Sequence, residues 1–196
     1  MLRKIVMVMA IMMFGLVSMA GAAIMTFDEI NISGAGNYQD ITNYQGFDFT
    51  NASILNTQGL DQWNGYLHGC VSPHNVLFNP WGNDLRIDNT TDFTFNRGYF
   101  TLANQYSGMV TVTGYNHYDE LYSTEFEVNM NTPSLINFNW TGINRVLISS
   151  NENYHLSMDN FRFNEGGEVP IPPTILLFGS SLIGMVTIGR RKFFNN

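Results

Sequence analysis

Short runs of alternating apolar and polar residues dominate the sequence between Met25 and Phe163, and Gly, Asn, Asp and Pro interrupt them. A period of two places successive side chains on opposite faces of a strand. Short strands that recur about every ten residues are typical of a β-sandwich or barrel. The chain also has 15 Phe and 9 Tyr but only 13% charged residues, a composition that favours strands. The sequence therefore predicts one all-β domain.

The alternation predicts strands near residues 25–30, 46–50, 75–79, 84–87, 92–96, 98–103, 109–115, 120–128, 134–139, 145–149 and 155–163. The clearest feature is the hairpin formed by 109–115 and 120–128, because its alternation continues on both sides of a polar turn. Residues 31–45 and 56–74 lack periodicity and are expected to form long loops.

The last predicted strand needs an irregularity to bury its apolar side chains. Leu156 and Met158 alternate with polar residues, as do Phe161 and Phe163, but the two pairs are out of phase. A β-bulge adds one residue to a strand and restores a common face. We therefore expect a bulge at Asp159-Asn160.

The first 22 residues have the three-part order of a secretory signal peptide. Arg3 and Lys4 precede an apolar run over residues 5–17, and small residues follow near Ala22. A transmembrane anchor is the alternative, but the run is short for a bilayer span and lacks a charged stop. We therefore expect export and cleavage, which leaves residues 23–164 as the folded domain.

The other end of the chain predicts a membrane segment. A Gly/Pro-rich linker over residues 165–173 leads into an apolar segment, 174–189, and then into a basic tail, 190–196. The basic cluster should stay cytoplasmic by the positive-inside rule. A buried C-terminal helix of the domain is the alternative, but it does not explain the basic cluster after the apolar segment.

These C-terminal residues resemble the PEP-CTERM sorting signal of Gram-negative bacteria that make exopolysaccharide. The matching residues of the proline motif and the basic cluster are Val169, Pro170, Pro172, Arg190, Arg191 and Lys192. Ile171 stands where the family usually has Glu. The resemblance implies sorting to the cell envelope or extracellular surface and processing of the tail by an exosortase-type membrane peptidase. It covers residues 168–192 and implies a destination without an activity.

Charge excludes one class of partner. Residues 23–189 contain no lysine and only four arginines against sixteen acids, which gives this segment a net charge of −12. Nucleic-acid binding needs a basic patch or stripe, so no nucleic-acid partner is expected. Cys70 is the only cysteine, so the chain cannot form an internal disulfide.

The domain also resembles the jelly-roll sandwiches of PEP-CTERM proteins and carbohydrate-binding modules, through the sequences at residues 25–28 and 158–163. The resemblance implies a jelly-roll-like β-sandwich in which the first and last strands pair; other sandwich topologies remain open. Such pairing would bring together four residues with oxygen ligands suited to a structural Ca²⁺ ion, Asp28, Glu29, Asp159 and Asn160. Alternatively, these residues cap turns.

Several aromatic residues fall in predicted loops or at strand ends, outside the alternating core. They are Tyr44, Trp63, Tyr66, Trp81, Tyr115 and Tyr118. Exposed aromatic rings stack on pyranose sugars, so these residues are candidates for a carbohydrate-binding surface. The alternative is that Trp63 and Trp81 plug the ends of the sandwich.

No catalytic residue stands out. The sequence has no Gly-x-Ser-x-Gly motif, and sixteen acids offer no unique carboxylate pair. His68, Cys70 and His74 are interpreted as ordinary loop residues. The leading hypothesis is a non-enzymatic, exported surface or matrix protein that contacts exopolysaccharide. The alternatives are a secreted glycan hydrolase and a structural component that self-associates through free strand edges.

Overall fold

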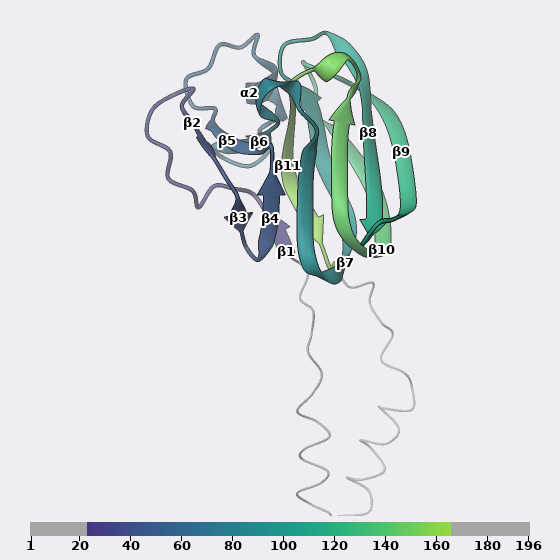
Figure 1. The fold of residues 1–196 in the computed structure, drawn as a ribbon. Helices are drawn as coiled ribbons and strands as arrows, with labels where there is room; N and C mark the ends of the chain where they lie inside the picture. Colours follow the sequence, from purple (N-terminus) through teal and green to yellow (C-terminus); the bar gives the residue numbers. More distant parts are fainter. Residues whose placement is uncertain (1–22, 166–196) are drawn as a thin grey trace, which may run out of the picture. The chain divides into compact units, whose positions relative to one another are not determined.

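The computed structural model describes residues 23–165, so the predicted signal peptide, membrane segment and basic tail, and all of the linker except Glu165, lie outside the described residues. Within residues 23–165, no helix has the length and apolar character needed to cross a membrane. Eleven antiparallel strands form the domain, which confirms the predicted all-β fold (Figure 1).

The strands are β1 (Ala23–Met25), β2 (Tyr38–Asp40), β3 (Asn43–Tyr44), β4 (Phe47–Thr50), β5 (Ser53–Asn56), β6 (Asn75–Phe78), β7 (Leu85–Leu102), β8 (Ser107–Asn116), β9 (Asp119–Asn129), β10 (Ser134–Ser150) and β11 (Leu156–Phe163). A short helix, α2 (Gly65–Gly69), precedes β6, and two 3-10 turns, η2 (Pro80–Gly82) and η3 (Asn151–Asn153), precede β7 and β11.

The strands lie in the order β2-β5-β6-β11-β7-β10-β8-β9. Strand β1 pairs with β11, with Ala23 opposite Phe163, which confirms the expected pairing of the first and last strands. Strand β4 pairs with β3 and with the start of β7. The two ends of the domain therefore lie next to each other (Figure 1).

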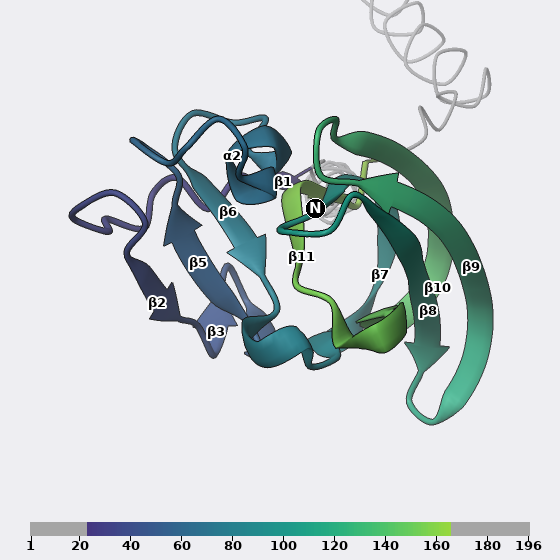
Figure 2. The same ribbon diagram turned by 90° about the horizontal axis from the view of Figure 1, so that it is seen from above.

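Two long strands shape the sheet. Strand β7 pairs with β4 at its start and with β11 over its second half, while β10 pairs with it along most of its length. Register shifts follow Asn137, Trp140 and Ile143 in β10, where Asn139 and Gly142 have positive φ angles. Such irregularities bend a ladder and increase its twist. Strands β8, β9 and β10 accordingly curve around the domain in Figure 2.

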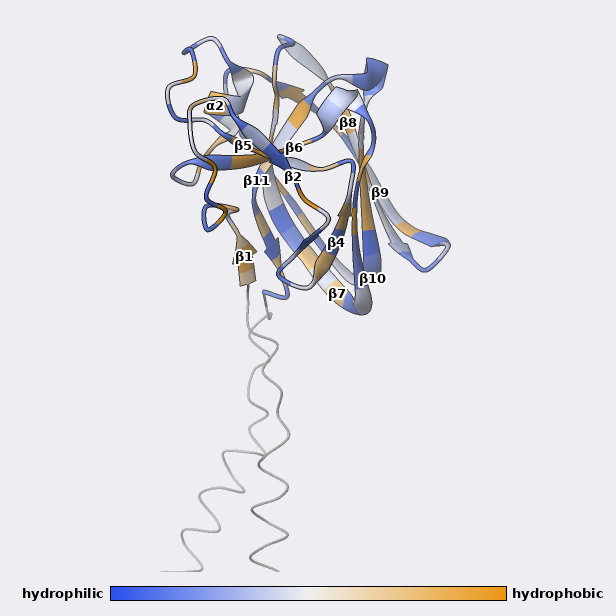
Figure 3. Cartoon of the chain, turned by 60° about the vertical axis from the view of Figure 1, so that its left-hand side comes forward, coloured by the Kyte–Doolittle hydropathy of each residue, from blue (hydrophilic) through white to orange (hydrophobic). Residues whose placement is uncertain are grey.

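Both halves of the bent sheet contribute to one large core. Phe95 of β7 lies at its centre, with its ring centroid 4.6 Å from that of Phe161 and 4.5 Å from that of Phe138. Apolar residues alternate with polar ones along the long strands (Figure 3). This alternation turns one face of each strand toward the core.

A smaller core lies between β5, β6 and α2. Leu55, Val76 and Phe78 are buried there, and Tyr66 of α2 packs against them. Helix α2 begins after Asn64, whose side chain accepts a hydrogen bond of 2.9 Å from the Tyr66 amide. Gly65 lies so close to β7 that a Cβ atom there would be 1.9 Å from the Leu102 carbonyl oxygen. This contact fixes the position of Tyr66.

The strand prediction is confirmed in part: β6 was found although it is buried at every position, whereas the first strand spans Ala23–Met25 instead of residues 25–30. The hairpin of β8 and β9 is confirmed, and so is the bulge, because the β11 register shifts after Asp159 and Asn160 has a φ of 53°. Strands β2 and β3 lie in a stretch expected to be a loop, and β5 was missed. Strand β2 is exposed and β5 is buried at every position, so neither alternates.

Candidate functional site

A groove with a volume of about 940 Å³ lies beside the smaller core. Strands β2, β4, β5 and β6 contribute to it, together with α2 and the turn η2. Its apolar and aromatic lining comprises Tyr38, Ile41, Phe49, Ala52, Leu55, Tyr66, Phe78, Pro80 and Trp81. Its polar lining comprises Asp40, Thr42, Thr50, Asn51 and His155.

Trp81 stands out in this groove because it is 80% exposed and has the backbone conformation φ 62°, ψ 13°. A bulky residue in this left-handed region is strained, and strained residues cluster at functional sites. Its neighbour Gly82 has φ 71°, and a Cβ atom there would lie 1.8 Å from the Asn153 carbonyl oxygen. The close packing of η2 against η3 therefore holds Trp81 in the strained conformation.

Buried Asn79 anchors the same turn. Its Nδ2 donates hydrogen bonds to the carbonyl oxygens of Asn83 at 2.9 Å and Tyr154 at 3.2 Å. Its Oδ1 accepts one from the Leu156 amide at 2.6 Å. Because both polar atoms of the side chain are used, the turn that presents Trp81 is tied to the start of β11.

Tyr38 provides a second exposed aromatic ring. It belongs to the edge strand β2 and is 58% exposed. Its ring meets Phe78 edge-on, with a centroid separation of 5.8 Å and an interplanar angle of 88°. This arrangement is favourable for aromatic pairs and positions the Tyr38 ring while leaving much of it open to solvent.

Tyr66 and His155 form a polar pair in the groove wall. The Tyr66 hydroxyl oxygen and His155 Nδ1 lie 2.8 Å apart and share a hydrogen bond. The ring of Phe78 packs against both, at centroid distances of 5.2 Å from Tyr66 and 6.5 Å from His155. Burial raises the pKa of Tyr66 well above its ordinary value. Its phenol therefore stays neutral across the physiological pH range.

Asp40 is the charged group of the groove. It is exposed on β2, and one of its carboxylate oxygens accepts a hydrogen bond of 2.5 Å from Ser53 Oγ. The carboxylate keeps further acceptor sites, since an ionised carboxylate accepts about four hydrogen bonds. Among the described residues that line the groove, Asp40 supplies the one carboxylate, and none is Lys or Arg.

All four arginines of residues 23–165 pair with carboxylates elsewhere. Arg86 and Arg145 each lie 2.6 Å from Asp88. The other two converge on one acid: Arg97 lies 3.2 Å and Arg162 3.0 Å from Glu165. With four arginines and fifteen acids, residues 23–165 carry a net charge of −11. The groove therefore belongs to an acidic surface.

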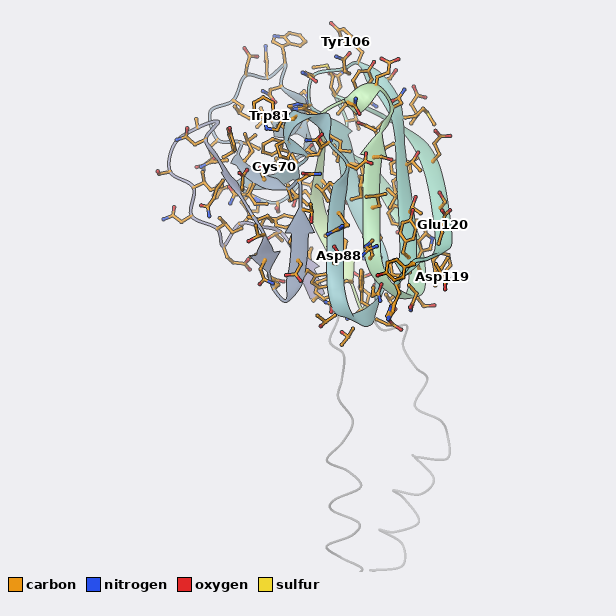
Figure 4. The ribbon with its side chains drawn as sticks, viewed as in Figure 1. Cys70, Trp81, Asp88, Tyr106, Asp119 and Glu120 are labelled. Carbon is orange, nitrogen blue, oxygen red and sulfur yellow. The ribbon has the colours of Figure 1, made fainter. Side chains whose placement is uncertain are left out.

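The structure brings two of the predicted sugar-binding residues, Tyr66 and Trp81, into the groove. The other four do not line it. Trp63 is 71% exposed before α2, Tyr115 lies on β8, and Tyr118 is 93% exposed at the β8–β9 turn. Figure 4 places Trp81 on the side of α2 and β5, whereas Asp119 and Glu120 of the β8–β9 turn lie on the other side. Tyr44 packs against Phe27.

Sequence reasoning named only Tyr66 and Trp81 among the fourteen lining residues, and Tyr38, Asp40 and His155 are the most informative of those that it missed. Tyr38 met the criterion used for the other aromatic residues, since it lies in a stretch without alternation. Asp40 follows it by two positions and faces the same side of β2. No sequence pattern marked His155 as a site residue, because its neighbours in the groove are distant in the sequence.

Three of the four predicted calcium ligands, Asp28, Glu29 and Asp159, have other partners, whereas the buried Asn160 Oδ1 has no hydrogen-bond partner among the described residues. Asp28 Oδ1 accepts hydrogen bonds from the amides of His74 at 2.9 Å and Asn75 at 3.0 Å. Glu29 pairs with the hydroxyl of Tyr44. In residues 23–165 no group of three or more His, Cys, Asp or Glu side chains is placed to hold a metal ion. Asp28 instead caps a turn, which was the alternative interpretation.

Asp159 is fully buried and binds the same loop as Asp28. Its Oδ2 accepts hydrogen bonds from the amides of Val71 at 2.8 Å and Ser72 at 2.7 Å, and the Ser72 hydroxyl also donates to the carboxylate. Burial raises the pKa of Asp159 to about 6, although the hydrogen bonds from Ser72, Asn160 and Val71 act in the opposite direction. The two aspartates therefore fix the loop between α2 and β6.

The loop residues His68, Cys70 and His74 do not form a metal or catalytic cluster. His68 Nδ1 lies 2.7 Å from the Met130 carbonyl oxygen, and the Cys70 thiol donates to the Ser72 carbonyl at 3.0 Å. Burial raises the pKa of Cys70 to about 11. The thiol is therefore protonated at neutral pH and is a poor nucleophile.

No family model and no curated protein matches the sequence. Two solved structures match parts of the fold. An arabinose-bound α-L-arabinofuranosidase is 12% identical, with a TM-score of 0.38 over 61% of this chain and 23% of that chain. An agarase is 11% identical, with a TM-score of 0.40 over 73% of this chain and 24% of that chain. The chain thus matches only about a quarter of the length of each enzyme.

Proposed function

We propose that this is an exported protein of the bacterial envelope or extracellular surface whose β-domain binds polysaccharide in the groove beside Trp81. The observation that carries the proposal is the exposed indole of Trp81, held in a strained backbone conformation by buried contacts. Such strain persists only where the surrounding structure imposes it, and it points to a functional role. A packing role for Trp81 is not compatible with its 80% exposure.

The groove has the two kinds of contact that sugars need. The rings of Trp81 and Tyr38 offer apolar faces for pyranose rings, and Asp40, His155 and the threonines offer hydrogen-bonding groups for hydroxyls. Glycoside hydrolysis ordinarily uses two carboxylic acids flanking the scissile bond. The groove lining supplies only Asp40 among the described residues, and this favours binding over cleavage.

The bent ladder of β7 and β10 is compatible with a jelly-roll-like β-sandwich, and we propose that topology for residues 23–164. Strand β9 forms one edge of the sheet and carries Glu125 and Glu127. Acidic residues on an edge strand oppose pairing with a second copy, because like charges would face each other. Binding to polysaccharide is therefore favoured over self-association through β9.

The proposed location, the cell envelope or extracellular surface, is supported by the two ends of the sequence. The signal-like residues 1–22 support export, and the PEP-CTERM-like residues 168–192 support sorting through the membrane by an exosortase-type peptidase. Mass spectrometry of the mature protein from envelope and medium tests this proposal. We expect a new C-terminus near Pro172, and a mature protein that keeps the residues after Pro172 would contradict tail processing.

Polysaccharide binding is tested with the exported protein and two matched variants, Trp81→Ala and Trp63→Ala. Both remove an exposed indole, but only Trp81 lines the groove. Affinity electrophoresis against a panel of soluble polysaccharides should show binding that Trp81→Ala weakens about tenfold, equivalent to about 1.4 kcal/mol. The Trp63→Ala variant should bind like the unaltered protein. Equal loss in both variants, or no loss in either, would contradict the groove assignment.

A further inference from the structure

We infer that the groove selects neutral polysaccharides and rejects acidic ones. The inference rests on the proposed function and names the class of ligand for the same site. It follows from three properties of the described residues: the charges that line the groove, the pairing of every arginine with a carboxylate elsewhere, and the position of Asp40 in the groove lining, two residues after Tyr38 on β2.

Recognition of an acidic glycan needs a cation, and the groove does not provide one. Uronate and sulfate groups are typically bound by Arg or Lys through charge-assisted hydrogen bonds. None of the described lining residues is Arg or Lys, and the four arginines of residues 23–165 are held by Asp88 and Glu165, neither of which lines the groove. An acidic sugar would therefore leave water without gaining an opposite charge.

The electrostatic field of the whole domain also disfavours acidic ligands. Residues 23–165 carry a net charge of −11, and a polyanion that approaches this surface meets repulsion before it reaches the groove. The repulsion is long-ranged at low ionic strength and is screened within about 10 Å at 0.1 M salt. Discrimination against acidic polymers should therefore depend on salt.

The carboxylate of Asp40 contributes to the same selectivity through its direct contacts in the groove. Its carboxylate lies on β2 two positions from Tyr38, so it borders the face on which a sugar would stack. Hydroxyl groups of a neutral sugar can donate to its free lone pairs, since Ser53 Oγ occupies only part of its acceptor capacity. A carboxylate on the sugar would instead face a second carboxylate. The same residue thus favours neutral ligands and disfavours acidic ones.

The test compares neutral and acidic polymers that share a backbone: hydroxyethyl cellulose with carboxymethyl cellulose, and dextran with carboxymethyl dextran. Affinity of the exported protein is measured at about 20 mM and about 500 mM NaCl. At low salt the neutral member of a pair should bind at least about tenfold more tightly than its carboxymethyl form. At high salt the ratio should shrink.

Two charge-neutralising variants locate the effect. Asp40→Asn should reduce the low-salt ratio, because the carboxymethyl polymer loses a repulsive neighbour while the neutral polymer loses one strong hydrogen-bond acceptor. Asp119→Asn removes the same charge at the exposed β8–β9 hairpin and should leave the ratio close to that of the unaltered protein. Thermal unfolding of both variants checks that the fold is kept. An equal effect of the two variants would overturn the role given to Asp40.

The outcomes separate the inference from the proposed function. Equal or tighter binding of the carboxymethyl polymers at low salt, lost in Trp81→Ala, would overturn the selectivity and leave polysaccharide binding intact. Absence of binding to every polymer, neutral and acidic alike, would overturn both. A preference for the neutral polymers that requires Trp81 and weakens with salt would support both.

Discussion

The Tyr66 hydroxyl oxygen lies 2.8 Å from Nδ1 of His155, a residue 89 positions later in the chain. This hydrogen bond joins α2 to the segment just before β11, and both residues face the groove. Phe78 packs against both rings. The groove wall is therefore assembled from three segments that share one small core.

The Tyr66–His155 bond should contribute measurably to stability. Tyr66→Phe keeps the ring but leaves His155 Nδ1 without its partner, so we expect the free energy of unfolding to fall by about 1 kcal/mol. Urea denaturation measures the change. Tyr118→Phe is the control, because Tyr118 is 93% exposed. Equal stability of the two variants would show that the bond is not formed in solution.

The turn that presents Trp81 should tolerate no side chain at Gly82. Gly46 and Gly82 both have positive φ angles, 81° and 71°, so alanine is strained at either position. Only at Gly82 would the new Cβ atom meet backbone, 1.8 Å from the Asn153 carbonyl oxygen. We expect Gly46→Ala to cost about 1 kcal/mol and Gly82→Ala clearly more, measured by urea denaturation.

Loss of polysaccharide binding in Gly82→Ala should accompany the loss of stability, because the substitution displaces η2 and with it Trp81. Gly46→Ala should bind normally. A Gly82→Ala protein as stable as Gly46→Ala would contradict the packing of η2 against η3.

Asp159 should make stability depend on pH in the acidic range. Its pKa is about 6 in the folded protein, whereas the ordinary pKa of an aspartate side chain in water is 3.8. Between these values the folded state binds more protons than the unfolded state, so stability from this group falls as pH rises from about 4 to about 6. The change amounts to roughly 3 kcal/mol at most, since one pKa unit corresponds to about 1.36 kcal/mol.

Asp159→Asn removes the titrating carboxyl group. The free energy of unfolding of this variant should therefore lack the fall between about pH 4 and about pH 6. Urea denaturation at several pH values between about 4 and 7 gives the slope of the free energy of unfolding against pH for each protein. The slopes are compared, and not the absolute stabilities, because the substitution also weakens hydrogen bonds to Val71 and Ser72. Asp119→Asn, on an exposed turn, is the control. Identical slopes for the Asp159 variant and the unaltered protein would contradict the prediction.

Calcium should not stabilise the domain through the first and last strands. The carboxylates of Asp28 and Asp159 already accept backbone amides of the loop at residues 71–75. A ligand that binds only the folded state raises the free energy of unfolding, and with it the melting temperature, with the logarithm of one plus the ratio of its free concentration to Kd. We therefore expect no change in melting temperature in a calcium titration to about 5 mM. A rise that Asp28→Asn abolishes would restore the calcium hypothesis.

Local alternation predicted the hairpin of β8 and β9 and the bulge near Asp159, because in both cases one face of a strand meets the core. The pairing of the chain ends was implied by the resemblance to jelly-roll sandwiches. It could not predict that residues 84–87, 92–96 and 98–103 form the single strand β7. Strand β7 is continuous because β10 pairs with both its halves. The pairing of β7 with β10 belongs to the tertiary structure, and a local sequence pattern carries no information about it.

The site was only partly predictable for the same reason. Trp81 and Tyr66 were found because aromatic residues outside an alternating pattern are informative by themselves. Asp40 and His155 belong to the groove only because residues far away in the sequence lie next to them. For His155 one such residue is Tyr66, with which it shares a hydrogen bond. The calcium hypothesis stays a prediction, and no sequence pattern indicated that backbone amides of residues 71–75 donate to two of its carboxylates.

Strand β11 has partners on both sides, with β7 along one and β6 and β1 along the other. The chain leaves the domain just beyond this strand. A force applied to Phe163 along the axis of β11 would act at right angles to the ladder hydrogen bonds of the strand. Those bonds would have to shear together instead of opening one at a time.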